Sequence, residues 1–206
     1  MPYTPEHKQK TRNRIVSAAR KLFNLRGFEA VSIDEIMREA GLTHGGFYKH
    51  FAAKDELYQE AVLEFICKEA PDAWQRKHID PAQSGPALAR MILDAYLSDE
   101  HFDERDASCP MIALPSDVQR SNPSVQGAFR QVLEMMAGAF EANLEPAARS
   151  SRQRALALTA MAVGAMVLAR AVDDPALARE VRQAARNEAY ARPGWGLAEA
   201  VPQAAQ

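Results

Sequence analysis

The stretch SIDEIMREAGLTHGGFYKHFAAK, from Ser32 to Lys54, decides the fold of this chain. Ser32 and Glu35 have the spacing of a capping box, in which each side chain bonds the backbone N–H of the other at the start of a helix. Apolar residues then recur at helical spacing, and they are Ile33, Ile36, Met37 and Ala40. Gly41 follows directly, where a left-handed residue ends a helix at little conformational cost. The first half of the stretch therefore predicts a short amphipathic helix that ends in a glycine turn.

The second half of the stretch predicts another helix, whose two faces differ. Thr43 stands where its side chain can accept a bond from a free backbone N–H and so cap this helix. Phe47 and Phe51 lie four residues apart on one face, which we expect to be buried. The other large side chains point elsewhere, and they are His44, Tyr48, Lys49 and His50. Two short helices, a tight turn and a polar outer face on the second helix form the helix-turn-helix pattern.

Residues 11–57 resemble the DNA-binding domain of the TetR family of bacterial transcriptional regulators. The resemblance rests on TRNRIVSAARKLFNLRGFEAVSIDEIMREAGLTHGGFYKHFAAKDEL, and its most specific part is GLTHGGFYKHF at 41–51. Met37 departs from the family pattern, which usually has Ala there, and Ala53 stands where the family often has a capping Ser. The resemblance implies a dimer that places the second helix of the motif in the major groove of double-stranded DNA. It also implies a C-terminal domain that binds a small molecule and forms the dimer.

The resemblance assigns nine residues to the DNA interface. They are Ser32, Thr43, His44, Gly45, Gly46, Tyr48, Lys49, His50 and Lys54. Residues at the start of a recognition helix reach base edges, glycines let the backbone approach DNA, and helix starts favour phosphate through their free N–H groups. A structural role is the alternative for His50, and a solvated charge is the alternative for Lys49 and Lys54. Which of the nine contact bases and which contact phosphates stays open.

The charge of the chain is divided unevenly along its length. Its 206 residues carry a net charge of −2, but residues 1–54 hold ten Lys or Arg against five Asp or Glu, whereas the remainder holds 15 against 22. A basic end on an acidic body suits a phosphate-binding domain joined to a domain that does not bind DNA. A chance imbalance between exposed helix faces is the alternative.

The sequence favours a cytoplasmic location with no membrane partner. The first ten residues, MPYTPEHKQK, lack the apolar run of a signal peptide. The longest uncharged apolar run, residues 155–169, is shorter than the roughly 20 residues needed to cross a bilayer. Two cysteines, Cys67 and Cys109, do not make a disulfide framework.

All predicted elements are helical, about nine in number, and the sequence shows no strand pattern or internal repeat. We expect a three-helix helix-turn-helix domain over residues 1–65 and a helical ligand-binding and dimerisation domain over residues 66–206. In this plan Thr11 caps the first helix after a polar tail, and the helix that follows the motif ends before Pro71. The chain is expected to be loose from Pro193 onward.

One helix of the body is predicted to form a homodimer seam. The helix over Arg152–Val172 is apolar nearly all round, so it must be covered on more than one side. Its small residues Ala160, Gly164 and Ala165 would let a partner helix approach closely. Together with the last helix, which begins near Pro175, it predicts a seam between two chains. The central helix of a monomeric bundle is the alternative.

Large, soft side chains in the body predict a pocket for a small-molecule effector that the sequence does not identify. They are Trp74, Met91, Met111, Phe129, Met136 and Met161. Methionine-rich surfaces adapt to varied ligands, whereas ordinary core packing is the alternative for each residue taken alone.

We therefore predict a DNA-binding regulator that is not an enzyme, and we favour a ligand-responsive repressor that binds a palindromic operator as a dimer. The sequence has no nucleophile elbow, zinc-protease, P-loop or dinucleotide-binding motif, and we expect neither a cofactor nor a metal. Two alternatives stay open: a redox or electrophile sensor through Cys109, and a helical interaction module without specific DNA binding. A sensor thiol needs nearby positive charge, and Arg105 is the only basic residue close to Cys109 in sequence.

Overall fold

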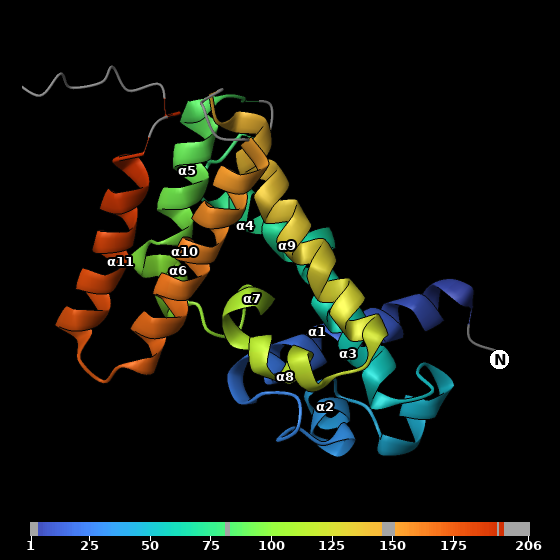
Figure 1. The fold of residues 1–206 in the computed structure, drawn as a ribbon. Helices are drawn as coiled ribbons and strands as arrows, with labels where there is room; N and C mark the ends of the chain where they lie inside the picture. The colour runs from blue at the N-terminus through green and yellow to red at the C-terminus, as the bar shows by residue number, and fades with distance from the viewer. Residues whose placement is uncertain (1–3, 81–82, 146–150, 193, 196–206) are drawn as a thin grey trace, which may run out of the picture.

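The computed structural model describes residues 4–80, 83–145, 151–192 and 194–195. All regular structure in these ranges is helical, which confirms the predicted all-α class (Figure 1). The described ranges hold eleven α-helices rather than about nine, with a 3-10 helix (η1) and a π-helical segment (η2). Their bounds are α1 Pro5–Arg26, α2 Ile33–Glu39, η1 His44–Lys49, α3 Lys54–Glu64, η2 Phe65–Glu69, α4 Ala70–Arg76, α5 Pro86–Tyr96, α6 Asp99–Asp103, α7 Pro110–Ala113, α8 Pro115–Arg120, α9 Pro123–Asn143, α10 Ser151–Ala171 and α11 Pro175–Tyr190.

The first helix begins at Pro5 rather than near Thr11. Thr4 caps α1 by accepting a hydrogen bond from the His7 N–H at 3.3 Å, and Pro5 fills the first helical position, where a missing N–H costs nothing. The Thr11 hydroxyl instead donates to the His7 carbonyl inside the helix. Residues 5–10, which we expected as a polar tail, are therefore helical, and residues 1–3 of that tail lie outside the described residues.

The connection between the helix-turn-helix and the body contains the π-helical segment. After α3 the chain widens into η2, where the Ala70 N–H bonds the Phe65 carbonyl, and α4 then runs through Pro71. The prediction that this helix ends before Pro71 is wrong. A proline in a helix lacks an N–H and its ring clashes with the carbonyl four residues earlier, and the wider π turn directly before Pro71 relieves both problems. The predicted domain boundary at residue 65 falls at the start of this segment.

The helix-turn-helix group and the body share one packed interior. α1, α2, η1 and α3 lie together at the bottom of Figure 1, and the long helix α9 packs against α3 below and α10 above. Asn122 caps α9 by accepting from the N–H groups of Ser124 and Val125, and Pro123 opens the helix. A continuous cluster of buried hydrophobic side chains runs from Ile15 in α1 to Trp195.

Polar bonds also join the two parts. The Asp117 carboxylate of α8 accepts from the Phe28 N–H at 2.8 Å, in the loop between α1 and α2. The Asn24 amide of α1 donates to the carbonyls of Asp106 and Ser108, each at 3.0 Å. A movement of α7 or α8 therefore acts directly on the helix-turn-helix group.

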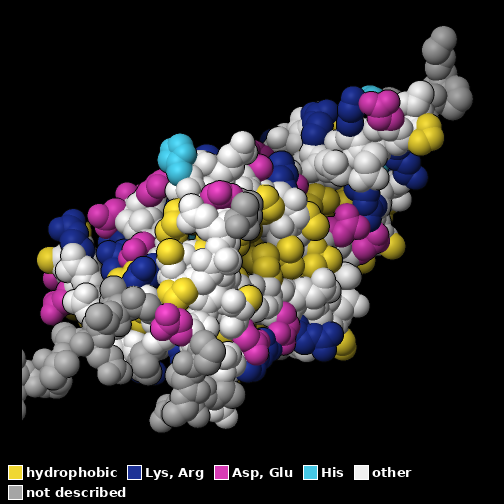
Figure 2. All heavy atoms as spheres, turned by 90° about the horizontal axis from the view of Figure 1, so that it is seen from above, with side chains coloured by type: hydrophobic (Ala, Val, Ile, Leu, Met, Phe, Trp, Pro, Cys, Tyr) yellow, Lys and Arg dark blue, Asp and Glu magenta, His cyan; other side chains and the backbone are white. Residues whose placement is uncertain are grey.

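The outer edge of the body is the pair α10 and α11. α10 packs between α9 and α11. By length and composition alone Ser151–Ala171 would suffice to cross a membrane, contrary to the expectation from the shorter run at 155–169, but a helix packed between two others passes the same test. Seen from above, hydrophobic side chains gather near the middle of the molecule, with charged side chains around them (Figure 2).

The inner face of α11 differs from the sequence pattern. The helical spacing of Leu177, Val181, Ala184 and Ala185 predicts one inward face, but Leu177 and Ala184 are exposed. An arginine lies on the inner face instead, because Arg182 donates to the Leu97 carbonyl at 3.2 Å and pairs with Asp99 at 2.6 Å. The described part of the chain therefore leaves these two apolar side chains of α11 uncovered.

The chain beyond α11 is partly packed. Trp195 is buried and donates its indole N–H to the Ala189 carbonyl at 2.7 Å, and the Gly194 carbonyl accepts from the Glu145 N–H at 3.1 Å. The expectation of a loose chain is therefore wrong at these two positions. Residues 193 and 196–206 lie outside the described residues.

Candidate nucleic-acid interface

The first helix of the motif starts with the predicted capping box. The Ser32 hydroxyl accepts from the Glu35 N–H at 3.2 Å, and the Glu35 carboxylate accepts from the Ser32 N–H at 2.8 Å. The bond from the Ser32 N–H, followed by that from Arg26, lowers the pKa of the Glu35 carboxyl to about 2. Ser32 is exposed at the start of α2, but its polar groups are already bonded within the motif.

Gly41 makes the turn between the two helices, as predicted. Its φ of +65° lies in the left-handed region, where a side chain would be strained. A Cβ there would also lie 3.1 Å from the Arg14 guanidinium, which donates to the Ala40 carbonyl. The turn therefore needs glycine for its backbone and is bound to α1 through Arg14.

The second helix of the motif is the 3-10 helix η1. The predicted cap by the Thr43 side chain is wrong, because Thr43 makes no capping bond. In a 3-10 turn each N–H bonds the carbonyl three residues earlier, and the Gly46 N–H bonds the Thr43 carbonyl at 3.0 Å. The N–H that a cap would have bonded is thus satisfied by the backbone, and the Thr43 hydroxyl stays on the surface.

Two buried phenylalanines hold η1 in place. Phe47 and Phe51 are both buried, as predicted, and their ring centroids are 5.6 Å apart. Tyr48 is next to Phe47 in the chain but 61% exposed, with its ring edge-on to Phe47 at 5.1 Å. The anchored side of η1 therefore fixes which side chains point away from the protein.

The exposed side chains of η1 form an open surface. We call Thr43, His44, Gly45, Tyr48 and Lys49, all exposed, the recognition face. A Cβ at Gly45 would meet nothing within 4 Å, so this position leaves room for another molecule. His44 is oriented from α2, because its Nδ1 lies 2.6 Å from Asp34 Oδ1. All five residues were assigned to DNA from the sequence.

Gly46 serves the packing of the motif. A Cβ there would lie 3.3 Å from the Met37 Cε, which is tighter than an ordinary contact. Gly46 thus lets η1 pack closely on α2, and Met37 is one of the two positions at which the sequence departs from the family pattern. Gly45, rather than Gly46, therefore leaves open space on the recognition face.

Arg12 joins α1 to the end of η1. Its guanidinium pairs with Glu56 at 2.8 Å and with Glu60, and donates to the His50 carbonyl. It also lies 4.0 Å from the centre of the Phe51 ring, within the range of a cation–π contact. These contacts of Arg12 fix the position of the chain at the end of η1.

His50 lies beside this network and near several cations. Its Nδ1 is buried and has no hydrogen-bond partner in the described part of the chain. Burial lowers the pKa of the His50 imidazole, and the positive charges of Lys8, Arg12 and Lys49 lower it further. The ring is therefore mostly neutral at pH 7 in the free protein.

Lys54 is turned toward the protein at the start of α3. Its ammonium donates to the Phe28 carbonyl and lies 4.1 Å from the centre of the Phe28 ring, and burial lowers the pKa of this ammonium. Ala53 stands at the N-cap and has no side chain to bond the first turn of α3. The backbone N–H groups, rather than the Lys54 ammonium, are the part of this site left for an anion.

The positive charge near the recognition face is only partly paired. Lys10, Lys21 and Arg26 make ion pairs with carboxylates of the same segment. Lys8 and Lys49 make no ion pair within the described residues, and both line a groove of about 400 Å³ between α1 and η1. Unpaired cations beside an open helical surface suit a negatively charged partner.

The sequence of the motif matches a known family. Residues 15–61 match the family model described as "Bacterial regulatory proteins, tetR family". This chain carries a TetR-family DNA-binding domain.

Curated relatives match this chain mainly over the motif. "Uncharacterized HTH-type transcriptional regulator YfiR" of Bacillus subtilis is 32% identical over 59 residues, 29% of each protein. The HTH-type transcriptional regulator LmrA of the same organism is 24% identical over 165 residues, 77% of this chain and 85% of that protein. The first of these alignments thus spans less than a third of the relative, so its other properties do not carry over.

Solved structures show the same fold over nearly the whole chain. Reduced NemR of Escherichia coli has a TM-score of 0.74 at 14% identity, over 92% of this chain and 100% of that one. A TetR transcriptional regulator of Chloroflexus aurantiacus has a TM-score of 0.73 at 20% identity, over 92% and 98%. The body of this chain is therefore a TetR-family body in fold, at identities that carry no residue roles.

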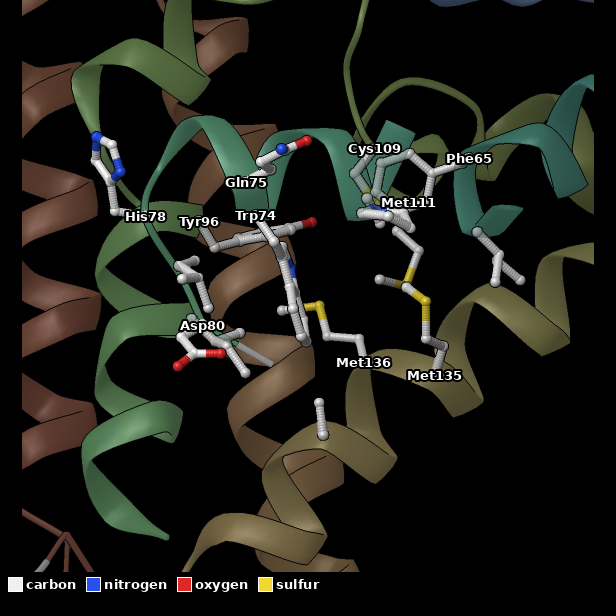
Figure 3. Close-up of a pocket in the computed structure, with 16 residues that line it drawn as sticks. Phe65, Trp74, Gln75, His78, Asp80, Tyr96, Cys109, Met111, Met135 and Met136 are labelled. Carbon is white, nitrogen blue, oxygen red and sulfur yellow. The ribbon is translucent and has the colours of Figure 1, made fainter. Parts of the chain in front are cut away.

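The body contains a pocket of about 770 Å³ between α4, α5, α7 and α9 (Figure 3). Trp74, Met111 and Met136, three of the six residues expected in a ligand pocket, line it. Tyr96 of α5 and Phe65 of η2 also line the pocket, although neither is among the six residues that the sequence predicts there. Its walls thus include η2, which connects the helix-turn-helix group to the body, as well as helices of the body itself.

The other three residues expected in the pocket, Met91, Phe129 and Met161, lie outside its lining. Met91 is one position from Ile92, a lining residue, which turns its side chain about 100° around α5. Phe129 precedes Met136 by two helical turns, about 10 Å along α9. Met161 belongs to α10, which contributes no lining residue in the described part.

Cys109 also lines the pocket and is buried. Burial raises the pKa of its thiol to about 11, so the thiol is protonated at neutral pH. Reactive cysteines have a lowered pKa and partial exposure. The structure therefore favours the reading of Cys109 as a small hydrophobic wall residue over a redox or electrophile sensor.

Proposed function

We propose that this protein is a cytoplasmic repressor that binds a palindromic operator as a homodimer and leaves it when a small-molecule effector fills the pocket of the body. The recognition face is the observation that carries this proposal, because it combines an anchored helix, exposed polar side chains and unpaired cations. Residues 1–65 would form the DNA-binding unit and residues 66–206 the effector and dimer unit. No catalytic role is proposed, since the relatives named above are described as regulators.

Exposed apolar residues on α10 and α11 support a homodimer. The large ones are Leu156, Val167 and Leu168 on α10, Val172 directly after it and Leu177 on α11. Ala160 is exposed and Gly164 half-buried on α10, whereas Ala165, expected with them, is buried in the chain itself. An apolar surface of this kind on two neighbouring helices is covered when a second copy packs against it. The two recognition faces would then lie about 34–36 Å apart, the spacing of successive major grooves.

Replacing Leu168 with arginine is expected to convert the dimer into a monomer. Leu168 is 61% exposed, so the substitution does not disturb the fold of one chain but buries a charge without a partner in the dimer. Light scattering after gel filtration should show the mass fall from twice 22.8 kDa to 22.8 kDa. Leu25→Arg, at another exposed leucine on α1, should leave the mass at that of a dimer. A wild-type chain of 22.8 kDa at micromolar concentration would contradict the proposal.

Two walls of the pocket are connected to the helix-turn-helix group, so a ligand in the pocket can change DNA binding. Phe65 of η2 follows directly on α3, and Met111 of α7 follows the segment that Asn24 of α1 bonds through Ser108. A ligand that fits better when these walls move apart shifts the spacing of the two recognition helices. By linkage, such a ligand weakens DNA affinity by the same factor by which DNA weakens ligand affinity.

Operator affinity is expected to rise as the pH falls, through His50. The imidazole is mostly neutral in the free protein because its pKa lies below the ordinary value of 6.5. A phosphate beside it raises the pKa in the complex, so binding takes up a proton, and affinity rises by up to about tenfold per pH unit for each His. The rise begins where the pH falls through the raised pKa of the complex and ends below the lowered pKa of the free protein.

To measure this effect, the logarithm of operator affinity is plotted against pH for the wild type and for His50→Gln, and the slopes of the two plots are compared. His7 and His44 are the other histidines of the helix-turn-helix group, so His7→Gln and His44→Gln serve as controls. Equal slopes for the wild type and His50→Gln between pH 8 and pH 5.5 would show that His50 takes up no proton and has a structural role only.

The operator is sought by selection from genomic fragments, followed by titration of the recovered site and a scrambled duplex at several salt concentrations. We expect tight binding at one palindromic site, two chains per site, with affinity falling by orders of magnitude between about 50 and 200 mM salt. Equal and weak binding to both duplexes would instead favour a helical interaction module that has kept the fold without specific DNA binding.

A further inference from the structure

The pocket in the body is apolar, aromatic and rich in sulfur. Trp74, Met135 and Met136 face one another across it, with Cys109 and Met111 at one end (Figure 3). No Lys or Arg is among its described lining residues, and the histidine and the carboxylate among them, His78 and Asp80, are exposed at the surface. Its volume of about 770 Å³ lies within the roughly 300–1,000 Å³ of small-molecule sites.

A tyrosine hydroxyl is buried among these apolar side chains. Tyr96 reaches from α5 across the pocket, beside Trp74 (Figure 3). Its hydroxyl oxygen is buried and makes no hydrogen bond of normal geometry in the described part of the chain. The Cys109 thiol interacts with this hydroxyl, but sulfur is a weak hydrogen-bond acceptor, so the demand of the hydroxyl for a strong partner is not met. Burial raises the pKa of this phenol well above its ordinary value, so the hydroxyl keeps its proton. A buried polar group without a partner is costly, and a ligand atom that bonds it would recover that cost.

We propose that the pocket takes an uncharged, largely aromatic molecule with one hydroxyl or carbonyl oxygen seated against the Tyr96 hydroxyl. This inference rests on the proposed function, in which the same pocket holds the effector. Methionine sulfur and aromatic rings make favourable contacts with a flat aromatic ligand. An anion would lose its water without meeting a cation, because no Lys or Arg lines the pocket among the described residues. Carboxylates and phosphate esters are therefore excluded as the main ligand class.

Three matched probes test this chemistry: 2-naphthol, naphthalene and 2-naphthoate. They share one ring system and differ in a neutral hydroxyl, no polar group and a negative charge. Binding is measured on the full chain, without DNA, by the change in intrinsic tryptophan fluorescence. The chain has two tryptophans, and only Trp74 lines the pocket. Trp74→Phe should therefore remove the signal while the emission of the buried Trp195 remains.

We expect 2-naphthol to bind at least about tenfold more tightly than 2-naphthoate. Tyr96→Phe should weaken 2-naphthol about fivefold, as for the loss of one hydrogen bond, and leave naphthalene unchanged. Met135→Lys places a cation in the lining and should shift the preference toward 2-naphthoate, which keeps the test available if Tyr96→Phe does not fold. Equal or tighter binding of 2-naphthoate to the wild type, or an equal effect of Tyr96→Phe on 2-naphthol and naphthalene, would overturn the inference.

Release of the operator separates this inference from the proposed function. If 2-naphthol reaches Trp74 with the expected selectivity but leaves operator affinity unchanged, the ligand class stands and the effector role of the pocket fails. If the chain binds its operator but none of the neutral probes changes the Trp74 signal, the ligand class is wrong while the DNA-binding proposal stands.

Discussion

Replacing Gly45 with glutamate is expected to lower operator affinity at least about 100-fold while leaving the fold intact. A Cβ at Gly45 meets nothing within 4 Å, and its φ is not in the left-handed region, so the free protein accommodates a side chain there. In the complex the same side chain would fill the space between η1 and DNA and bring a carboxylate against phosphates. Each good base contact is worth roughly 1–3 kcal/mol, and a loss of about 3 kcal/mol corresponds to about 100-fold in affinity.

The control for this variant is Gly127→Glu on α9. A Cβ at Gly127 also meets nothing within 4 Å, so the two variants carry the same substitution and the same change in net charge. Fluorescence anisotropy with the selected operator should show Gly127→Glu within about threefold of the wild type, since surface charges far from an interface have small effects. Helical circular dichroism and the melting temperature should be alike for all three proteins. If Gly45→Glu bound like the control, η1 would not be the element that enters the groove.

The helix-turn-helix was predictable because its signals are local. The capping box needs only Ser32 and Glu35 at their spacing, and the turn needs only Gly41 with a positive φ, and both are present as expected. The Thr43 cap failed because its outcome depends on which backbone carbonyl bonds the Gly46 N–H, and two adjacent glycines allow a 3-10 turn. A one-residue change in hydrogen-bond register is below what sequence spacing can resolve.

The pocket was only half predictable because it is built from elements distant in sequence. Trp74 of α4 and Met136 of α9 meet only after the chain has folded, and their size was the sole local signal. Tyr96 has the spacing of a core residue, and nothing in the sequence shows that its hydroxyl makes no hydrogen bond of normal geometry in the described part of the chain. The helix through Pro71 was unpredictable for a similar reason. The π turn that accommodates the proline forms where the helix passes from the helix-turn-helix group into the body, and the sequence gives no local signal for it.

Truncating Phe47 to alanine is expected to cost about 3–5 kcal/mol of the free energy of unfolding, the largest stability loss we expect from one side chain of the motif. Phe47 is fully buried, and its ring packs between Phe51 and the edge of Tyr48, so removal leaves a cavity under η1. Urea unfolding followed by circular dichroism measures this loss. Operator affinity should fall as well, because η1 is no longer held in the orientation that exposes the recognition face.

Tyr48→Ala is the matched partner of this variant, one residue along the same helix. Its side chain is exposed, so stability should change by less than about 1 kcal/mol, whereas operator affinity should fall about tenfold or more. Together the two variants distinguish the role of Phe47 in anchoring η1 from the role of Tyr48 in contacting DNA. Phe47→Ala loses stability and, as a consequence, affinity, but Tyr48→Ala loses affinity alone. A large stability loss for Tyr48→Ala would mean that the tyrosine packs sideways against the protein, and the recognition face would then have to be redrawn without its aromatic ring.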